Sequence, residues 1–162
     1  MYNKGEYDVY KRETCQVKDI ISKYYKDRDY YLLSSLSDNS LMLKVPVDNN
    51  EIREVITRKE VNNIIRKIPK IDIISCDSKG LETVYKKCIN SGRHEDLIAI
   101  IKTTYLRNKE RIDNKKKTTD KDMYYFNLAE KYLYQEFQVA LGKDYDETKE
   151  YVINNVKKLF DK

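Results

Sequence analysis

The spacing of apolar residues changes near residue 55, and this change constrains the fold more than any other feature of the sequence. Before that point, short runs of β-branched and aromatic residues are separated by charged or Asp-Asn-Ser turns, a pattern typical of β-strands. After it, apolar residues recur every three or four positions, as they do along one face of a helix. The sequence therefore predicts a β-rich segment over residues 1–54 and an all-helical segment over residues 55–162, which together make an α+β protein.

Four or five short strands are expected in the first segment. Pro46 should end the last of them or place it at the edge of a sheet, because proline has no amide hydrogen for the strand ladder. So few strands can bury their apolar faces only by curling, and we expect a small barrel of the SH3 or Tudor type. The apolar runs that mark the strands are residues 9–10, 15–21 (Cys15, Val17, Asp19 and Ile21 in alternation), 30–33 and 41–45.

About five helices are expected in the second segment. Thr57 and Glu60 fit a capping box at the start of the first helix, and Pro69 should end that helix near residue 68. Gly92 and Gly142 should each follow the end of a later helix, because glycine readily adopts the left-handed conformation. Apolar spacing places the other helices at about residues 81–90, 97–111, 119–141 and 147–160, with a basic loop at 113–117.

Positive charge is concentrated in the middle of the chain. Residues 1–52 carry 8 Lys and Arg against 9 Asp and Glu, residues 53–117 carry 17 against 9, and residues 118–162 carry 7 against 9. A central block with a net charge of +8 would attract a phosphate backbone through counterion release. The solvated face of any lysine-rich helical protein has the same composition, so charge alone leaves nucleic-acid binding open.

Residues typical of catalysis or metal binding are scarce. His94 is the only histidine and stands at a predicted helix junction, where we expect a surface or capping role. Cys15, Cys76 and Cys88 are odd in number and form no CxxC pair, which favours free, partly buried thiols. The four glycines are isolated and form neither a phosphate-binding loop nor a dinucleotide fingerprint. We therefore expect no enzymatic activity, no cofactor and no metal site.

The hydropathy pattern and the cysteines predict a cytoplasmic protein. No stretch approaches the roughly 20 apolar residues that span a bilayer, and the start MYNKGEYDVY lacks the apolar core of a secretion signal. Unpaired cysteines suit a reducing compartment.

Tyrosine is the dominant aromatic residue, with 15 copies against three phenylalanines and no tryptophan. A tyrosine ring can pack at the edge of a core while its hydroxyl stays in water. Beside basic residues on an exposed surface it can instead stack on nucleic-acid bases. The core-edge role is the expected one for the tyrosines in periodic elements, and base stacking is the alternative.

Several stretches together resemble a known family. In the first half they are KGEYDVY (residues 4–10), YLL (31–33) and LMLKVPVDN (41–49). In the second half they are DLIAIIK (96–102), YLR (105–107), LAEK (128–131) and QEFQVALG (135–142). Their order and spacing over nearly the whole chain are similar to those of the CarD family of bacterial transcription regulators, which bind RNA polymerase.

The resemblance implies a division of labour between the two segments. Residues 1–54 would form a Tudor-like module that docks on the β subunit of RNA polymerase, and residues 55–162 a basic helical domain that contacts promoter DNA. Family members thereby tune the stability of the open promoter complex. The resemblance places the polymerase contact on Lys44 and its neighbour Met42, and it implies neither a membrane nor a small-molecule substrate.

The sequence departs from the family pattern at Ser78, where relatives carry a tryptophan that wedges against the bases. A serine lacks the stacking area of an indole, so a contribution of about 1–3 kcal/mol per stacked base would be absent. Weak DNA contact would then depend on phosphates, which position a protein without specifying sequence. The candidate phosphate contacts are Lys79, Lys86, Lys87, Arg93 and Lys102.

Three functions therefore stay open from the sequence. The first is a polymerase-bound transcription regulator that touches promoter DNA weakly and without sequence specificity. The second is a protein adaptor on polymerase that does not bind DNA. The third is a Tudor-like RNA-associated or ribosome-associated protein that uses tyrosine stacking.

Overall fold

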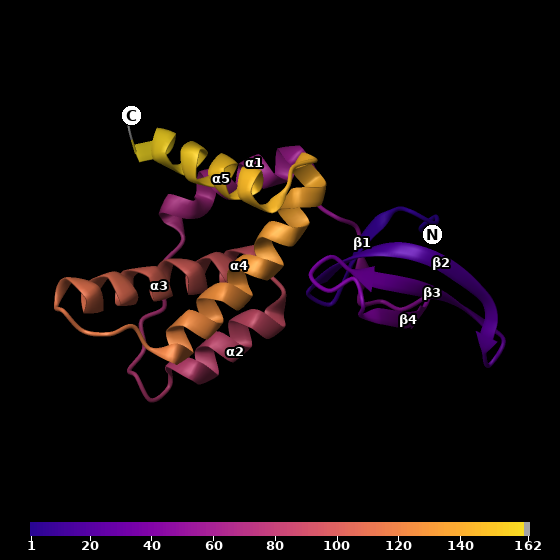
Figure 1. Cartoon of the computed structure of the whole chain (residues 1–162), viewed down its shortest axis with the longest axis horizontal. Helices are drawn as coiled ribbons and strands as arrows, with labels where there is room; N and C mark the ends of the chain where they lie inside the picture. Colours follow the sequence, from indigo (N-terminus) through magenta and orange to yellow (C-terminus); the bar gives the residue numbers. More distant parts are fainter. Residues whose placement is uncertain (161–162) are drawn as a thin grey trace.

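A computed structural model describes residues 1–160 as a β-rich N-terminal module beside a helical domain, joined by one segment at residues 54–57 (Figure 1). The predicted α+β class is confirmed. The strands are β1 (Tyr7–Tyr10), β2 (Glu13–Tyr25), β3 (Arg28–Ser35), β4 (Met42–Pro46) and β5 (Ile52–Arg53). The helices are α1 (Arg58–Lys67), the 3₁₀ turn η1 (Ile68–Lys70), α2 (Leu81–Ser91), α3 (His94–Asp113), α4 (Asp120–Leu141) and α5 (Tyr145–Phe160).

The five strands form one antiparallel sheet in the order β4-β3-β2-β1-β5. The two edge strands, β4 and β5, are not paired with each other among the described residues, so the sheet is open. The predicted closure into an SH3-like or Tudor-like barrel is therefore not confirmed. Pro46 ends β4 at the edge of the sheet, which is where a residue without an amide hydrogen is tolerated.

A register shift in β2 decides which of its side chains reach the core of the N-terminal module. The shift lies between Val17 and Asp19 in the pairing with β3. One extra residue reverses the alternation of side chains beyond it, so Ile20 packs on the same core as Cys15 and Val17. The simple alternation predicted from the sequence, which put Asp19 and Ile21 on the face of Val17, is wrong beyond this point, and Asp19 is exposed.

An aspartate is buried in the N-terminal module without a partner. Asp8 on β1 is 0% exposed, and neither of its carboxylate oxygens has a hydrogen-bond partner within residues 1–160. It lies opposite Cys15 of β2 in the strand ladder. Burial raises the pKa of Asp8 from 3.8 to about 6, because desolvation disfavours the charged form.

Thr57, Gly92 and Gly142 mark helix boundaries as predicted, and Thr119 caps the start of α4. The side chains of Thr57 and Thr119 accept hydrogen bonds from the amides of Glu60 and Asp122, each at 3.2 Å. The Glu60 carboxylate accepts from the Thr57 hydroxyl at 3.2 Å, a contact within the predicted capping box. Gly92 and Gly142 follow α2 and α4 in the left-handed conformation, with φ of 68° and 66°. These predicted boundaries are confirmed.

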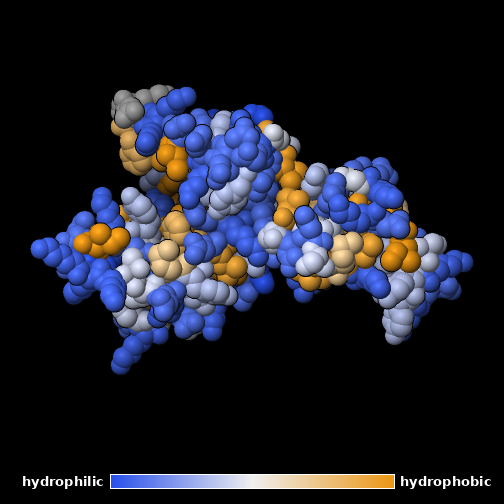
Figure 2. Space-filling model, viewed as in Figure 1, coloured by the Kyte–Doolittle hydropathy of each residue, from blue (hydrophilic) through white to orange (hydrophobic). Residues whose placement is uncertain are grey.

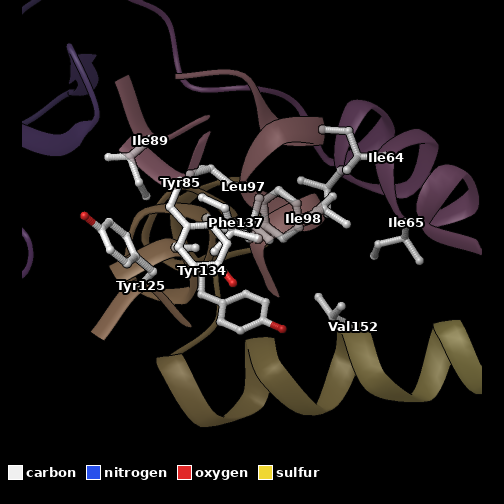
Figure 3. Close-up of a cluster of buried hydrophobic side chains, with 14 of the residues drawn as sticks. Ile64, Ile65, Tyr85, Ile89, Leu97, Ile98, Tyr125, Tyr134, Phe137 and Val152 are labelled. Atoms are coloured by element: carbon white, nitrogen blue, oxygen red, sulfur yellow. The ribbon is translucent and has the colours of Figure 1, made fainter. Parts of the chain in front are cut away.

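Helix α4 runs through the centre of the helical domain and packs on α1, α2, α3 and α5. Its buried face carries Ala129, Leu133 and Phe137, which recur every four positions within the helix predicted over residues 119–141. Figure 3 shows this core, with Phe137 among side chains from α2 and α3 that include Tyr85 and Leu97. Of the described helices, none is long and apolar enough to cross a membrane.

The three cysteines are free, as predicted, but Cys76 is not partly buried. Cys15 is buried, Cys88 is half-buried and Cys76 is exposed. Burial, together with the nearby carboxylates of Asp8 and Glu13, raises the pKa of the Cys15 thiol to about 12. The Cys15 thiol is therefore protonated at neutral pH and acts as part of the core.

Candidate partner and nucleic-acid interfaces

The edge strand β4 carries both residues predicted to contact polymerase. Within residues 1–160 it pairs only with β3, so the other side of its backbone is available for pairing with another strand. Met42 is 43% exposed and Lys44 is also exposed. The two side chains share one face of the strand because they are two positions apart, while Val45 on the opposite face is buried in the module core.

The ammonium group of Lys44 is held over an aromatic ring. Its Nζ donates a hydrogen bond to the Tyr24 hydroxyl at 3.1 Å and lies 4.7 Å from the centre of the same ring. Tyr24 in turn packs edge-on against Tyr30, with 5.3 Å between ring centres. No carboxylate within residues 1–160 forms an ion pair with Lys44, so its charge is free for an acidic group on a partner. Tyr24 was not among the predicted site residues, because the strand that contains it, β2, was expected to end near residue 21.

Helix α2 brings four predicted DNA contacts to one element. Lys86 and Lys87 lie on its exposed face, Lys79 lies in the turn before it and Arg93 in the turn after it. A helix of 11 residues is about 16 Å long, so these cations are spread along one short helix and its flanking turns. Lys86 also lies 3.9 Å from Glu82, one turn earlier, which offsets part of the positive charge. We call this surface the α2 face.

Ser78 lies in the exposed turn that precedes α2, and a tyrosine from α4 lies beside this helix. Tyr124 is 61% exposed and packs edge-on against the buried Tyr125, with 5.0 Å between ring centres. Together with Lys86 of α2, these tyrosines line a shallow pocket of about 260 Å³. An exposed ring beside a cation is the arrangement that base stacking requires. The role predicted for tyrosines in periodic elements, which include Tyr124, was to pack at the edge of a core.

Arg12 extends the α2 face from the N-terminal module. Its Nη1 donates a hydrogen bond to Oδ1 of Asn90 on α2 at 3.0 Å, and its guanidinium carbon lies 5.7 Å from the ring centre of Tyr132. Arg12, Asn90 and Tyr132 line the same pocket as Tyr124. Arg12 was not among the predicted contacts, because 78 positions separate it from Asn90 and no local pattern links them.

Lys102 lies apart from the α2 face. Its Nζ donates to the backbone carbonyls of Ile68 and Ile71, at 2.8 and 2.6 Å. Ile68 is the first residue of η1 and Ile71 follows its last residue, so the lysine ties α3 to this turn. Of the five cations predicted to contact DNA, Lys102 is the one whose charge the structure uses inside the helical domain.

A buried carboxylate on α4 joins the two halves of the molecule. The Glu136 side chain is 3% exposed and accepts hydrogen bonds from Arg53 Nη1 and Nη2 at 2.6 and 2.7 Å. It also accepts from the Ile56 amide at 3.0 Å and from His94 Nε2 at 2.8 Å. Burial alone would raise the pKa of Glu136, but the hydrogen bonds from Arg53 and His94 outweigh it and lower the pKa to about 2. We call these four residues the Glu136 junction.

The Glu136 junction corrects the surface or capping role predicted for His94. The histidine is the first residue of α3, but its side chain is only 17% exposed. Its ring lies near Phe137, with 6.4 Å between ring centres, and bonds to Glu136. The N-cap position belongs to Arg93. The prediction was wrong because the partner of His94 stands 42 positions away in the sequence.

Comparisons with known proteins do not identify the chain. No protein-family model matches it, and no curated protein matches its sequence.

Proposed function

We propose that the chain is an RNA polymerase-binding transcription regulator with the division of labour of the CarD family. In this proposal the N-terminal module is an opened, Tudor-like fold that docks on the β subunit through β4. The α2 face makes weak, non-specific contact with promoter DNA and thereby changes the stability of the open complex. The observation that carries the proposal is the free edge of β4, with Lys44 held over Tyr24 beside the exposed Met42.

The β4 edge has the chemistry of a strand-addition site. Unpaired backbone groups on one side of β4 can pair with a strand of the partner, and alternate side chains then give specificity. Here those side chains are Met42, which offers apolar area, and Lys44, which offers a charge without an ion-pair partner in residues 1–160. An acidic or mixed edge strand on the partner fits this surface best.

Reversing the charge of Lys44 tests the docking surface. We expect Lys44→Glu to weaken binding of the full chain to a purified β-subunit fragment by about tenfold, or about 1.4 kcal/mol. Lys18→Glu is the matched control, since it changes an exposed lysine elsewhere in the module, and it should leave the affinity nearly unchanged. Titration calorimetry measures both. A wild-type chain that fails to bind the fragment would overturn the polymerase proposal.

The α2 face supports the DNA part of the proposal. Cations from the helix, its two flanking turns and Arg12 form a basic surface to which both modules contribute. Such cations contact phosphates and carry little sequence information. Tyr124 adds an exposed ring beside Lys86, and it could contact an unstacked base where the promoter strands separate.

Salt-dependent binding to a forked promoter duplex tests the α2 face. The double variant Lys86→Glu and Lys87→Glu should bind more weakly, and the slope of log affinity against log salt should fall by about 2 because about two phosphate contacts are lost. The control double variant, Lys59→Glu and Lys158→Glu, makes the same charge change at exposed lysines of α1 and α5. If the affinity for DNA fell equally in both double variants, the binding site would not be localised on the α2 face.

Two outcomes would select the alternative functions. A wild-type chain that binds the β-subunit fragment but no DNA at low salt would be a polymerase adaptor. The tyrosine-lined pocket beside α2 favours the RNA-associated alternative, because aromatic stacking suits unpaired bases. Tighter binding to single-stranded RNA than to the forked duplex, without binding to the β-subunit fragment, would select it.

A further inference from the structure

A cavity of about 580 Å³ lies between α3, α4 and α5, in the helical domain and apart from both proposed interfaces. Its size falls within the range of about 300–1,000 Å³ that is usual for small-molecule sites. Neither polymerase docking nor DNA contact uses any residue that lines it, apart from Lys102, which the structure assigns to η1. The cavity therefore needs its own explanation.

The walls of the cavity are mainly apolar, with branched aliphatic side chains as the largest group and aromatic rings beside them. Ile98 and Ile101 come from α3, Leu133 from α4, and Val152 and Val156 from α5. Figure 3 shows Val152 on α5 opposite side chains of the domain core that include Ile98. Such walls offer few hydrogen bonds, so they suit a hydrocarbon chain better than a nucleotide or a sugar.

The mouth of the cavity leaves large apolar side chains in water. Tyr105 is 57% exposed, Ile153 is 41% exposed and Phe160 is 70% exposed. Figure 2 shows apolar atoms gathered on the C-terminal part of α5. Large apolar side chains exposed at the mouth of a cavity are typical of a ligand-binding surface.

Charged groups at the cavity determine the sign of the ligand. Lys102, Lys149 and Lys157 line it with one carboxylate, that of Glu130, which leaves a net charge of +2. The Glu130 side chain is 8% exposed, and its Oε2 lies 3.7 Å from Nζ of Lys149. Burial raises the pKa of Glu130, although Lys149 opposes the shift. A cationic ligand would increase the local charge, whereas an anionic head group would balance it.

We propose that this cavity binds one free fatty acid. Its acyl chain lies along the aliphatic walls between α3 and α5, and its carboxylate lies near Lys149 and Lys157. The inference does not depend on the proposed function, because it uses a different surface and a different class of ligand.

Calorimetric titration of the full chain with dodecanoate, below the concentration at which it forms micelles, tests the proposal. We expect saturable binding at one site per chain, about tenfold tighter than binding of dodecylammonium, which has the same alkyl chain and the opposite charge. Dodecanol, with no charge, should bind with intermediate affinity. Equal affinity for all three compounds, or no saturable binding of dodecanoate, would overturn the proposal.

Two variants locate the site. Val152→Trp fills the cavity with a larger side chain and should abolish dodecanoate binding while circular dichroism shows the helices intact. Ile153→Gln removes apolar area at the exposed mouth, where folding is not at risk, and should weaken binding several-fold, by about 1 kcal/mol. Binding that both variants leave unchanged would overturn the proposal. The proposal would also be overturned if the chain bound only phosphatidylglycerol vesicles, or if it dimerised through this surface in sedimentation runs without added lipid.

Discussion

Replacing Glu136 by glutamine is expected to lower the free energy of unfolding by about 3 kcal/mol at pH 7. The charged carboxylate accepts four hydrogen bonds, two from Arg53 and one each from His94 and Ile56. The amide keeps the shape but turns one acceptor oxygen into a donor, which then faces N–H groups. Arg53 would lose its buried counter-charge, and a partly buried cation without a partner is costly.

Urea unfolding followed by circular dichroism measures this loss. Glu150→Gln makes the same chemical change on the exposed surface of α5 and should shift stability by less than about 0.5 kcal/mol. If the two variants were equally stable, the Glu136 junction would not hold the modules together. The urea dependence should also become less cooperative in Glu136→Gln, because the two modules lose one of the contacts that join them.

The stability that Glu136 provides should disappear in acid. Because its pKa in the folded chain is about 2, below the ordinary value of 4.5, its contribution is complete above about pH 5 and is lost as pH falls from there toward 2. The Glu136→Gln variant has no such group to titrate. Its stability should therefore fall less steeply than that of the wild type over this range.

Replacing Asp8 by asparagine is expected to have the opposite effect and to stabilise the chain by about 2 kcal/mol at pH 7. Asp8 is fully buried, and neither oxygen has a partner within the described residues. At neutral pH the folded chain must therefore either hold the Asp8 charge in its core without a partner or bind a proton on this carboxylate. Either choice reduces the free energy of unfolding. Asparagine has nearly the same shape and no charge.

The pH dependence identifies the cause of the Asp8 effect. Its folded pKa of about 6 lies above the ordinary 3.8, so the contribution of Asp8 to stability is most favourable below about pH 4 and becomes less favourable as pH rises through 6. The gain from Asp8→Asn should accordingly be small at pH 4 and complete above pH 7. Asp19→Asn changes an exposed aspartate of β2 and should show no such gain. A gain that did not vary with pH would point to packing instead of charge.

The helix ends were predictable because their signals are local. The Thr57 and Thr119 caps act within three residues, and Gly92 and Gly142 act on the helix they follow. The β2–β3 hairpin was not predictable, because its turn lacks the glycine or asparagine that usually marks such a turn. Lys26 and Asp27 both have positive φ, at 50° and 59°, in a two-residue turn that usually contains glycine or asparagine. The strands therefore continue further than their apolar runs indicate.

The candidate sites likewise include residues that the sequence could identify and residues that it could not. Lys44 and the cations of α2 lie on single elements, so their exposure followed from the position of each element in the sequence. Glu136 was read as part of a family motif and not as a junction residue, because Arg53 stands 83 positions away. Contacts of this length depend on how the modules pack, and no spacing within the chain encodes that packing.

The Glu136 junction holds the N-terminal module and the helical domain in a fixed relative orientation. A linker of four residues alone would let the two modules swing independently, but the carboxylate fixes Arg53 and the start of α3 to α4. In Figure 1, β4 and α2 both lie along the lower side of the view. Whatever holds β4 therefore also sets the position and angle at which α2 meets a second partner. The separation between the two partners becomes a property of the fold.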